Sequence, residues 1–290
     1  MSGAEVECGD WAYQAWLSGG ISYRLGDDPF GHYIEQALKD NGIGTNLLTY
    51  DTVYRTGIQL KEYVEDGHDP AAPYYRKGSA ASHLSAQEID ALDLEEIGLV
   101  HVTGIPPALS KEAREATYRL MERAREVQIP VTFDPNLRPA LWENGETMRN
   151  VLNDLANYAD VVLPGIGECE ILAGTTDKEK AADFYHQKGA ALVVIKDGKN
   201  GAYVSEKKEN GEVVRDMIPG YPVKKVVDTV GAGDGFAVGV LSGLLKGLPV
   251  TECAKRGNAI GSIQVQHRGD NEGLPTEEIL ESYMAGNIQK

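Results

Sequence analysis

The sequence has little cysteine and no long apolar segment. Its three cysteines, Cys8, Cys169 and Cys253, are odd in number and widely spaced, so they indicate neither a disulfide framework nor a zinc site. No apolar run approaches the length that spans a membrane, and the first residues lack the hydrophobic core of a signal peptide. We therefore expect a cytoplasmic protein that does not bind a membrane.

Basic residues are also scarce. Lysine and arginine number 28 against 44 aspartates and glutamates, which gives a formal net charge of −16. Nucleic acids and anionic membranes repel a chain this acidic, so a phosphate would have to be bound by local groups and not by a surface field. We expect small-molecule chemistry and no nucleic-acid partner.

Internal repeats and low-complexity linkers are absent as well. The 290 residues, 42% of them hydrophobic, suffice for one large domain with a substantial core. From residue 98 onward, strand patterns alternate with helical patterns, which is typical of a parallel sheet covered by helices. We therefore predict a single α/β domain over residues 1–290.

Two common phosphate-binding motifs are missing too. The chain has no G-x-x-x-x-G-K-[ST] run, and a dinucleotide fingerprint starting at Gly231 fails because Phe236 stands where glycine or alanine is needed. Instead, residues 228–234 read Asp-Thr-Val-Gly-Ala-Gly-Asp. β-branched residues at 223–227 precede this stretch, and apolar residues at helical spacing follow it, so we predict a strand, a turn and a helix.

The glycine-rich turn has the features of an anion site. Gly231 and Gly233 let the backbone turn tightly, where the new helix presents unpaired N–H groups and its positive dipole end. Asp234 lies in the first helical turn. Its carboxylate would repel a phosphate unless an acceptor hydroxyl lies between them, which favours phosphoryl transfer. The alternative is that the glycines form only a turn and Asp234 caps the helix.

The stretch 228–234 resembles the C-terminal signature of the ribokinase-like (PfkB) carbohydrate kinases. The resemblance implies that the amides of Gly231, Ala232 and Gly233 hold the transferring phosphate and that Asp234 is the catalytic base. It also allows a monovalent cation, K⁺, near Asp228. The fold it implies is a ribokinase-like three-layer α/β/α sandwich with a small β-sheet lid.

A β-hairpin inserted at about residues 45–90 is the candidate for that lid. Lids exclude water, which a kinase needs if it is not to hydrolyse its donor. Tyr74 and Arg76 lie on one face of the second strand, because side chains alternate. Taken alone, residues 74–76 favour an ordinary interpretation over a functional one, because a pair of tyrosines usually packs within a hairpin and an exposed arginine is usually a solvated charge.

Residues 74–80 resemble the segment with which 2-keto-3-deoxygluconate kinases bind an acidic sugar. The resemblance implies that Tyr74 and Arg76 contact the substrate, and Gln59 stands where some members place a substrate-contacting tyrosine. It also implies a homo-oligomer formed through the lid.

The N-terminal stretch departs from the family pattern. Residues 2–6 resemble the sugar-contacting segment, which implies substrate contacts for Gly3 and Ala4. However, Glu7 stands where the family has asparagine, and the family's opening core strand is missing. A sugar- or nucleotide-binding protein without turnover therefore remains an alternative.

Polar residues follow the strand at 131–134 in the sequence Asp134-Pro-Asn136-Leu-Arg138. Open α/β sheets bind their ligands at the carboxyl ends of strands, although an ordinary turn with a surface arginine fits as well. A fixed guanidinium there could bind a substrate carboxylate or neutralise the charge that moves with the phosphoryl group. The phrase resembles a loop of 2-keto-3-deoxygluconate kinases and related fructokinases. The resemblance gives Arg138 a catalytic and sugar-binding role and Asn136 a nucleotide contact.

The remaining site residues are implied by the resemblance alone. Lys196 ends the buried strand 191–196, Gly198 and Gly201 follow it, and all three would border ATP. Asn258 would contact the adenine side, and Asp270 would be a further substrate contact.

A magnesium contact is implied in the same way. Glu168 matches the glutamate of an Asn-x-x-Glu motif that organises Mg²⁺ through water, although Gly165 replaces the asparagine. Mg²⁺ would screen the triphosphate of ATP.

Glycines recur on two consecutive predicted helices. Gly235, Gly239 and Gly243 are four residues apart, and Gly257 and Gly261 repeat the spacing on the next helix. We expect these two helices to pack closely, backbone to backbone.

These observations lead to one functional hypothesis with two alternatives. We expect ATP-dependent phosphorylation of the 6-hydroxyl of 2-keto-3-deoxygluconate, with Asp234 taking the hydroxyl proton. A fructokinase or another PfkB sugar kinase would share Asp234 and Arg138, so only residues 74–76 argue for an acidic sugar. The second alternative is the binding protein without turnover.

Overall fold

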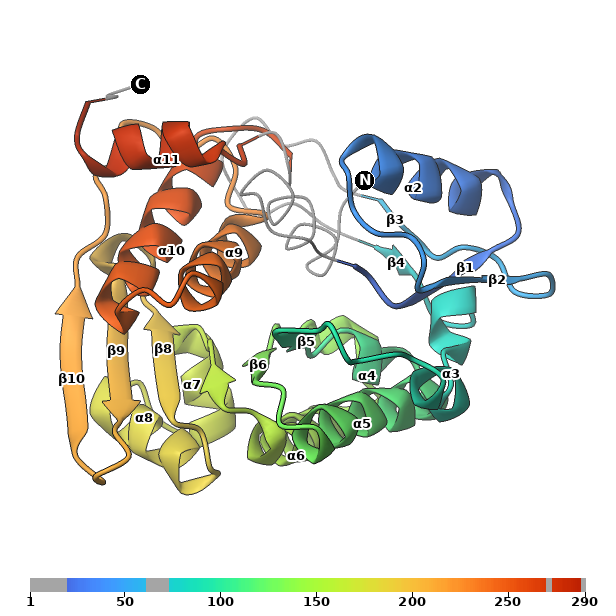
Figure 1. Ribbon diagram of the computed structural model, residues 1–290, viewed down its shortest axis with the longest axis horizontal. Coiled ribbons are helices and arrows are strands. Elements are labelled where there is room, and N and C mark those ends of the chain that lie inside the picture. The colour runs from blue at the N-terminus through green and yellow to red at the C-terminus, as the bar shows by residue number, and fades with distance from the viewer. Residues whose placement is uncertain (1–19, 61–72, 270–272, 288–290) are drawn as a thin grey trace.

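A six-stranded sheet forms the centre of the molecule (Figure 1). The computed structural model describes residues 20–60, 73–269 and 273–287. The strand order is β10-β9-β8-β7-β6-β5, with β5 to β8 parallel and β9 antiparallel to both of its neighbours. The strands are β5 (Val100–Thr103), β6 (Val131–Asp134), β7 (Val161–Val162), β8 (Leu192–Lys196), β9 (Ala202–Lys207) and β10 (Val213–Ile218).

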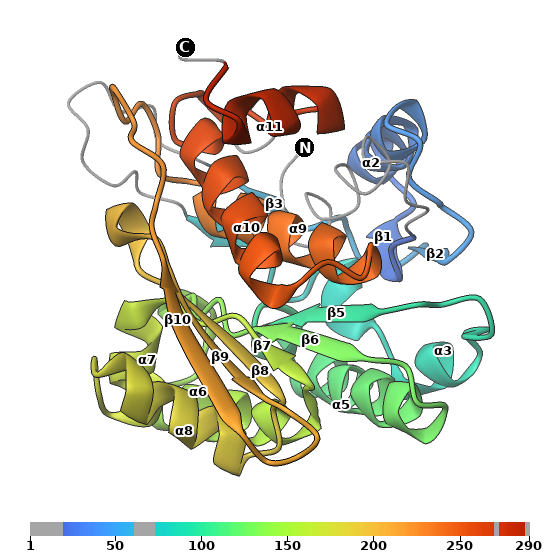
Figure 2. The same ribbon diagram turned by 60° about the vertical axis from the view of Figure 1, so that its left-hand side comes forward.

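Helices cover both faces of this sheet (Figure 2). One layer consists of α4 (Pro106–Leu109), α5 (Lys111–Glu126), α6 (Gly145–Leu155), α7 (Ile166–Ala173) and α8 (Lys178–Gln187). The other contains α9 (Ala232–Leu245) and α10 (Val250–Gln264), with α11 (Glu277–Met284) packed on α10. Short elements are α3 (Ala86–Asp90), η1 (Ala80–His83), η2 (Pro139–Leu141), η3 (Ala156–Tyr158) and η4 (Gly198–Asn200). The predicted three-layer α/β/α sandwich is confirmed.

The apolar strand residues explain this layering, because they alternate between two core clusters. Val162, Val193 and Ile195 join the cluster under α4 to α8. Val161, Leu192 and Val194, which alternate with them along β7 and β8, join the cluster under α9 and α10. Strands buried on both faces read as continuous hydrophobic runs, as the segment 191–196 does.

The sheet becomes polar at β5 and β6 on one face. Here the side chains that alternate with apolar ones are His101, Thr103, Thr132 and Asp134. The His101 Nδ1 lies 2.8 Å from the Thr132 hydroxyl, and burial lowers the pKa of His101 to about 4, so this imidazole is neutral near pH 7. The polar face ends at Asp134, the last residue of β6.

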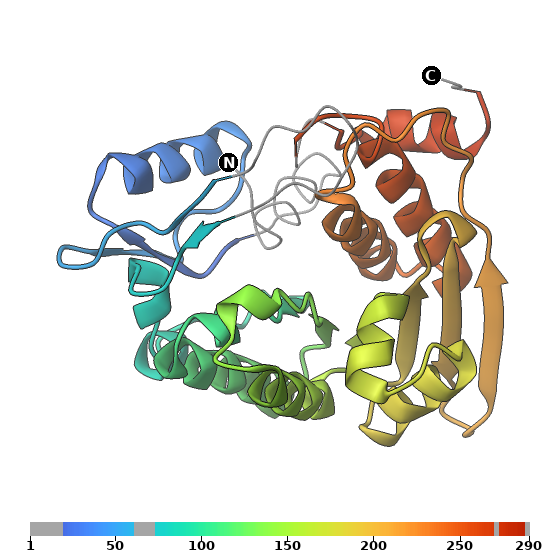
Figure 3. The same ribbon diagram turned by 180° about the vertical axis from the view of Figure 1, so that it is seen from behind.

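Two small strand pairs lie apart from the main sheet (Figures 1 and 3). β1 (Tyr23–Gly26) and β2 (Leu48–Asp51) are parallel and are connected through α2 (Pro29–Asp40). β3 (Ile58–Gln59) pairs antiparallel with β4 (Tyr74–Tyr75). The hairpin strands expected at this place are therefore present but short, and residues 61–72 lie outside the described ranges.

The strand predicted at residues 223–227 is wrong. The chain leaves the sheet at the end of β10, and residues 219–230 contain no strand. Val226 and Val227 are 56% and 38% exposed, and the amides of Val227 and Asp228 donate to the carbonyl of Val265, beyond α10. Because these amides are satisfied by a helix end, the β-branched run needs no strand partner. The predicted turn and helix are confirmed: Gly231 has φ of 78° and α9 begins at Ala232.

The close packing expected between the glycine-bearing helices is also confirmed. A Cβ at Gly239 would lie 2.5 Å from the Gly257 nitrogen, and one at Gly243 would lie 2.7 Å from the Cys253 sulfur. The backbones of α9 and α10 therefore touch where glycine removes the side chain. This contact fixes the direction of α9, whose first turn carries the predicted anion site.

Gly239→Ala should destabilise the protein, because its methyl group would meet backbone that cannot move aside. The overpacking cost of up to about 3 kcal/mol exceeds the gain of about 1 kcal/mol in helix propensity. Gly167→Ala on α7 is the matched control, because nothing lies within 4 Å of its added Cβ. Urea unfolding should show a lower free energy for the first variant and an equal or higher one for the second. Equal effects would contradict this packing.

Candidate active site

The carboxyl ends of the central strands bring together one ammonium and two carboxylates. Lys196, at the end of β8, places its Nζ 2.5 Å from the Oδ2 of Asp134, at the end of β6. Burial lowers the pKa of Lys196, but Asp134 and Glu168 raise it more strongly, so the net pKa is raised. Lys196 therefore keeps its positive charge although its side chain is only 17% exposed.

Glu168 ties a helix to the loop that follows β6. Its two carboxylate oxygens accept hydrogen bonds from the amides of Gly165, at 2.7 Å, and Leu137, at 3.2 Å. Burial raises the pKa of Glu168. Within residues 20–60, 73–269 and 273–287, no group of three His, Cys, Asp or Glu side chains could hold a metal ion. The water-mediated Mg²⁺ contact of Glu168 stays a prediction.

The loop after β6 adopts an unusual backbone. Asn136 and Arg138 have φ of 38° and 44°, in the left-handed region, which costs about 1 kcal/mol or more for a residue with a side chain. A Cβ at Gly104, after β5, would clash with the carbonyl oxygen of Pro135, so the two loops pack backbone to backbone. Strain of this kind concentrates at functional sites.

The first turn of α9 meets this loop. The side-chain nitrogen of Asn136, Nδ2, donates to the Oδ1 of Asp234 at 3.2 Å, and a Cβ at Gly233 would lie 3.8 Å from the Lys196 Nζ. Asp234 therefore faces the strand ends and not the helical core, and no side-chain cap is present at the start of α9. The amides of this first turn, which lack intrahelical acceptors, lie next to an ammonium and a carboxylate. That arrangement can hold a phosphate beside a base.

The predicted face of the small hairpin is also assembled. Arg76 donates from Nη2 to the Oε1 of Gln59 at 2.8 Å, and its guanidinium carbon lies 5.3 Å from the centre of the Tyr74 ring. Tyr74 packs against the main core cluster. Gln59, Tyr74 and Arg76 thus share one face, which is turned toward the body of the molecule. Their substrate contacts remain predictions.

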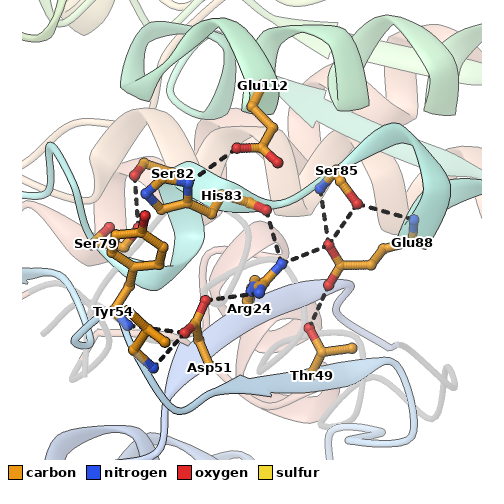
Figure 4. Close-up of polar contacts among 11 residues, drawn as sticks. Arg24, Thr49, Asp51, Tyr54, Ser79, Ser82, His83, Ser85, Glu88 and Glu112 are labelled. Atoms are coloured by element: carbon orange, nitrogen blue, oxygen red, sulfur yellow. Dashed lines mark hydrogen bonds and ion pairs between the residues drawn. The ribbon is translucent and has the colours of Figure 1, made fainter.

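A polar network anchors the base of this hairpin (Figure 4). Arg24 on β1 pairs with Asp51 at 2.8 Å and with Glu88 at 3.1 Å. Asp51 in turn accepts hydrogen bonds from the amides of residues 53 and 54, and the Tyr54 ring stacks on His83 with centroids 3.6 Å apart. The chain that enters β3 is therefore fixed to β1, η1 and α3.

Arg24→Ala should lower the free energy of unfolding by about 2 kcal/mol, because it leaves a buried carboxylate without its cation. Arg119→Ala is a matched control. The two arginine side chains are 26% and 30% exposed, but Asp51 is 4% exposed whereas Asp90, a partner of Arg119, is 50% exposed. Exposed pairs contribute less than about 1 kcal/mol. Equal losses in urea unfolding would show that partner burial is not decisive.

Two of the residues predicted to border the nucleotide, Gly201 and Asn258, contact the end of β10. Asn258 is buried and donates from its amide nitrogen to the carbonyls of Ile218 and Pro219, each at 3.1 Å. Gly201 has φ of 99°, and a Cβ there would clash with the Ile218 carbonyl oxygen. Gly198, with φ of 51°, lies between this turn and Lys196. Asn258 thus holds backbone through its nitrogen, and its adenine contact stays a prediction.

Other predicted residues are placed less completely. Asp228 accepts a hydrogen bond from the amide of Val230 at 3.0 Å. Its contact with a monovalent cation stays a prediction. Arg138 is half-buried at the same loop as Asn136. Gly3, Ala4 and Asp270 lie outside the described residues.

Sequence reasoning did not select Asp134 as a site residue. The structure makes it the partner of Lys196 and the acceptor, at 3.2 Å, of the Asn136 amide hydrogen. The available signal was an acid at the end of a buried strand, at the edge where ligands bind.

Comparison with known proteins agrees with this geometry. Residues 16–277 match the family described as pfkB family carbohydrate kinase. The chain belongs to this family. A 2-dehydro-3-deoxygluconokinase from Bacillus subtilis (strain 168) is 45% identical over 288 residues, which cover 98% of this chain and 86% of the relative. The predicted resemblance is therefore confirmed.

Solved structures of pfkB kinases share the fold. A PfkB protein from Polaromonas sp. JS666 is 42% identical and superposes with a TM-score of 0.85, covering 97% of this chain and 89% of the other. A fructokinase from Vibrio cholerae O395 is 26% identical with a TM-score of 0.87, covering 98% and 91%. In the described part of this pfkB chain, no helix is both long enough and apolar enough to cross a membrane.

Proposed function

We propose that this carbohydrate kinase transfers the γ-phosphoryl group of ATP to the 6-hydroxyl of 2-keto-3-deoxygluconate, which is the same compound as 2-dehydro-3-deoxygluconate. The observation that carries the proposal is that the first turn of α9, with Gly233 and Asp234, lies next to the ammonium of Lys196. The identity with the kinase from B. subtilis supports the choice of sugar.

In the proposed reaction, the phosphoryl group moves from ATP to the sugar and the hydroxyl proton moves to Asp234. The sugar oxygen forms a bond to the γ-phosphorus while the bond from that phosphorus to the β,γ-bridging oxygen breaks, which releases ADP. The hydroxyl proton passes to the carboxylate of Asp234. The first-turn amides of residues 231–233 and the Lys196 ammonium stabilise the charge that moves with the phosphoryl group.

ATP is the phosphoryl donor in this proposal, and Mg²⁺ neutralises charge on its phosphates. A fructokinase double mutant from V. cholerae was solved with fructose, ADP and a potassium ion, and a putative ribokinase II from E. coli with ATP and Mg²⁺. Glu168 would contact Mg²⁺ through water, since both of its oxygens already accept backbone hydrogen bonds. Asp228 would border a K⁺ ion.

Cationic side chains would select the acidic sugar. Arg76 lies over Tyr74 on the inward face of the hairpin, and Arg138 lies in the loop beside the base. A guanidinium binds a carboxylate through two parallel hydrogen bonds. A neutral sugar has no carboxylate and cannot form this pair. Gly3, Ala4 and Asp270 would complete the substrate contacts.

ADP release measured with ATP, Mg²⁺ and a panel of sugars and keto-acids tests the proposal. We expect turnover with 2-keto-3-deoxygluconate to exceed turnover with fructose and ribose. Preference for fructose would support the fructokinase alternative, for which the likeness to the V. cholerae enzyme is the present argument. Binding of sugar without ADP release would support the protein without turnover.

We also propose a homo-oligomer formed through the hairpin. Ile58 and Tyr75 are paired across β3 and β4 on its outward face and are 37% and 59% exposed, and Leu60 is 54% exposed. Exposed apolar groups of this kind mark contact surfaces. Light scattering should give a mass above that of one chain, and a monomer for the Ile58→Ser/Tyr75→Ser variant. A wild-type monomer would contradict this.

A further inference from the structure

We propose that Asn136 is a positioning residue that orients the Asp234 carboxylate for phosphoryl transfer, a role that rests on the proposed function. The family resemblance gives Asn136 a contact on the nucleotide side. The hydrogen bonds of its side chain point instead to the base.

The main observation is a hydrogen bond between residues 98 positions apart. The side-chain nitrogen of Asn136, Nδ2, donates to the Oδ1 of Asp234 at 3.2 Å, and Asn136 is only 6% exposed. Holding one carboxylate oxygen sets the plane of the carboxylate and hence the direction of the other oxygen. Asn136 can therefore act on the reaction through Asp234 without taking a proton itself.

The backbone of Asn136 is itself held in place from both sides. Its backbone N–H donates to the Oδ1 of Asp134 at 3.2 Å, and the other oxygen of Asp134 binds the Lys196 ammonium at 2.5 Å. On the other side, the amide of Leu137 donates to Glu168 at 3.2 Å. A chain of contacts thus runs from Lys196 through Asp134 and Asn136 to Asp234.

The conformation of Asn136 supports a functional reason for this residue. Its φ of 38° is left-handed, a region that asparagine tolerates better than other residues with a side chain. Glycine would fit the backbone with less strain but has no side-chain amide to donate a hydrogen bond. Asparagine is the residue that combines this backbone with a donor directed at α9.

A second feature indicates that the site expects a ligand. The Asn136 Oδ1 is buried, and no hydrogen-bond donor reaches it from the described residues. A buried acceptor without a partner costs about 1–3 kcal/mol, so a donor supplied by the bound substrate, such as a sugar hydroxyl, would recover that loss. One amide would then connect the base with the substrate.

The test compares three variants by kcat, by KM for both substrates and by ADP affinity. Asn136→Gly removes the amide and keeps the left-handed backbone. We expect its kcat to fall by about 10²-fold, because misplacing a reacting group by about 1 Å has that effect, while KM for ATP and ADP affinity change less than about threefold. Asn136→Asp should lose at least as much, since it places a like charge beside Asp234. Asn153→Gly, which removes a side-chain amide on α6 that donates to the carbonyl of Leu172 and not to Asp234, controls for stability.

A double-mutant cycle gives a readout that a structural role would not produce. In the Asp234→Asn background, single-turnover rates at saturating sugar and ATP should fall by less than about twofold on adding Asn136→Gly, because the base that Asn136 orients is already gone. A full additional loss would overturn the proposal, and so would an unchanged kcat in Asn136→Gly. A rise confined to KM for ATP would show a nucleotide contact instead. Failure of the proposed function looks different: the wild type would not phosphorylate the keto-acid, or Asp234→Asn would keep its turnover.

Discussion

Asp234→Asn should lower kcat by about 10³-fold or more while leaving sugar binding nearly intact. General-base catalysis contributes about 10²–10⁴-fold, and the amide keeps the shape of the side chain but cannot accept the hydroxyl proton. The hydrogen bond from Asn136 would also be lost or reversed, because an asparagine at 234 can turn its own N–H₂ toward that amide. The measurement is kcat from coupled ADP release, with the sugar dissociation constant from calorimetry.

Glu252→Gln provides the matched control for this variant. Glu252 is the acid in the first turn of α10, as Asp234 is in the first turn of α9. Any effect of charge at a helix start on folding is therefore shared by the two variants. Only Asp234→Asn should lose turnover. An unchanged kcat would remove Asp234 from the mechanism, and a lost sugar affinity would make it a binding group instead of a base.

The second large effect should come from removing the two arginines. Arg138→Gln and Arg76→Gln should each lower kcat/KM for 2-keto-3-deoxygluconate by about 10–100-fold, because hydrogen bonds to a charged group are worth about 1.5–3 kcal/mol. Fructose, which has no carboxylate, should lose much less with Arg76→Gln. The ratio of kcat/KM between the two sugars measures this difference.

The exposed Arg149 on α6 supplies the control, since Arg149→Gln should change neither kcat/KM. A comparable loss for the keto-acid and fructose in Arg138→Gln would place Arg138 on the phosphoryl group and not on the sugar carboxylate. Comparable losses in both variants would leave nothing to select an acidic sugar.

Much of the fold could be predicted because its signals are local. The apolar run predicted as a buried strand forms β8, and its residues 192–195 are buried on both faces of the sheet. The glycines of α9 and α10 predicted a contact between two helices, because they recur at one spacing. Signals of this kind lie within one or two elements.

The failure at residues 223–227 shows the limit of local signals. β-branched residues fit a strand only where a neighbouring strand accepts and donates hydrogen bonds. The chain had already left the sheet at Ile218, and the carbonyl of Val265 took up the amides of Val227 and Asp228. Propensity could not predict that partner, because it lies in another element.

The candidate site divides in the same way. The turn with Gly231 and the carboxylate of Asp234 were predictable from one stretch of sequence, and so was the shared face of Tyr74 and Arg76. The pairing of Asp134 with Lys196 was not, because it depends on which strands are neighbours in the sheet. Non-local contacts of this kind need the strand order.

Phosphorus NMR of the wild-type reaction with ATP, Mg²⁺ and 2-keto-3-deoxygluconate tests the central claim most directly. We predict one new phosphate monoester, coupled to the protons on C6 of the sugar, formed in equal amount with ADP, and much slower ester formation when fructose replaces the keto-acid. Release of ADP and inorganic phosphate without an ester, or faster ester formation on fructose, would contradict the account.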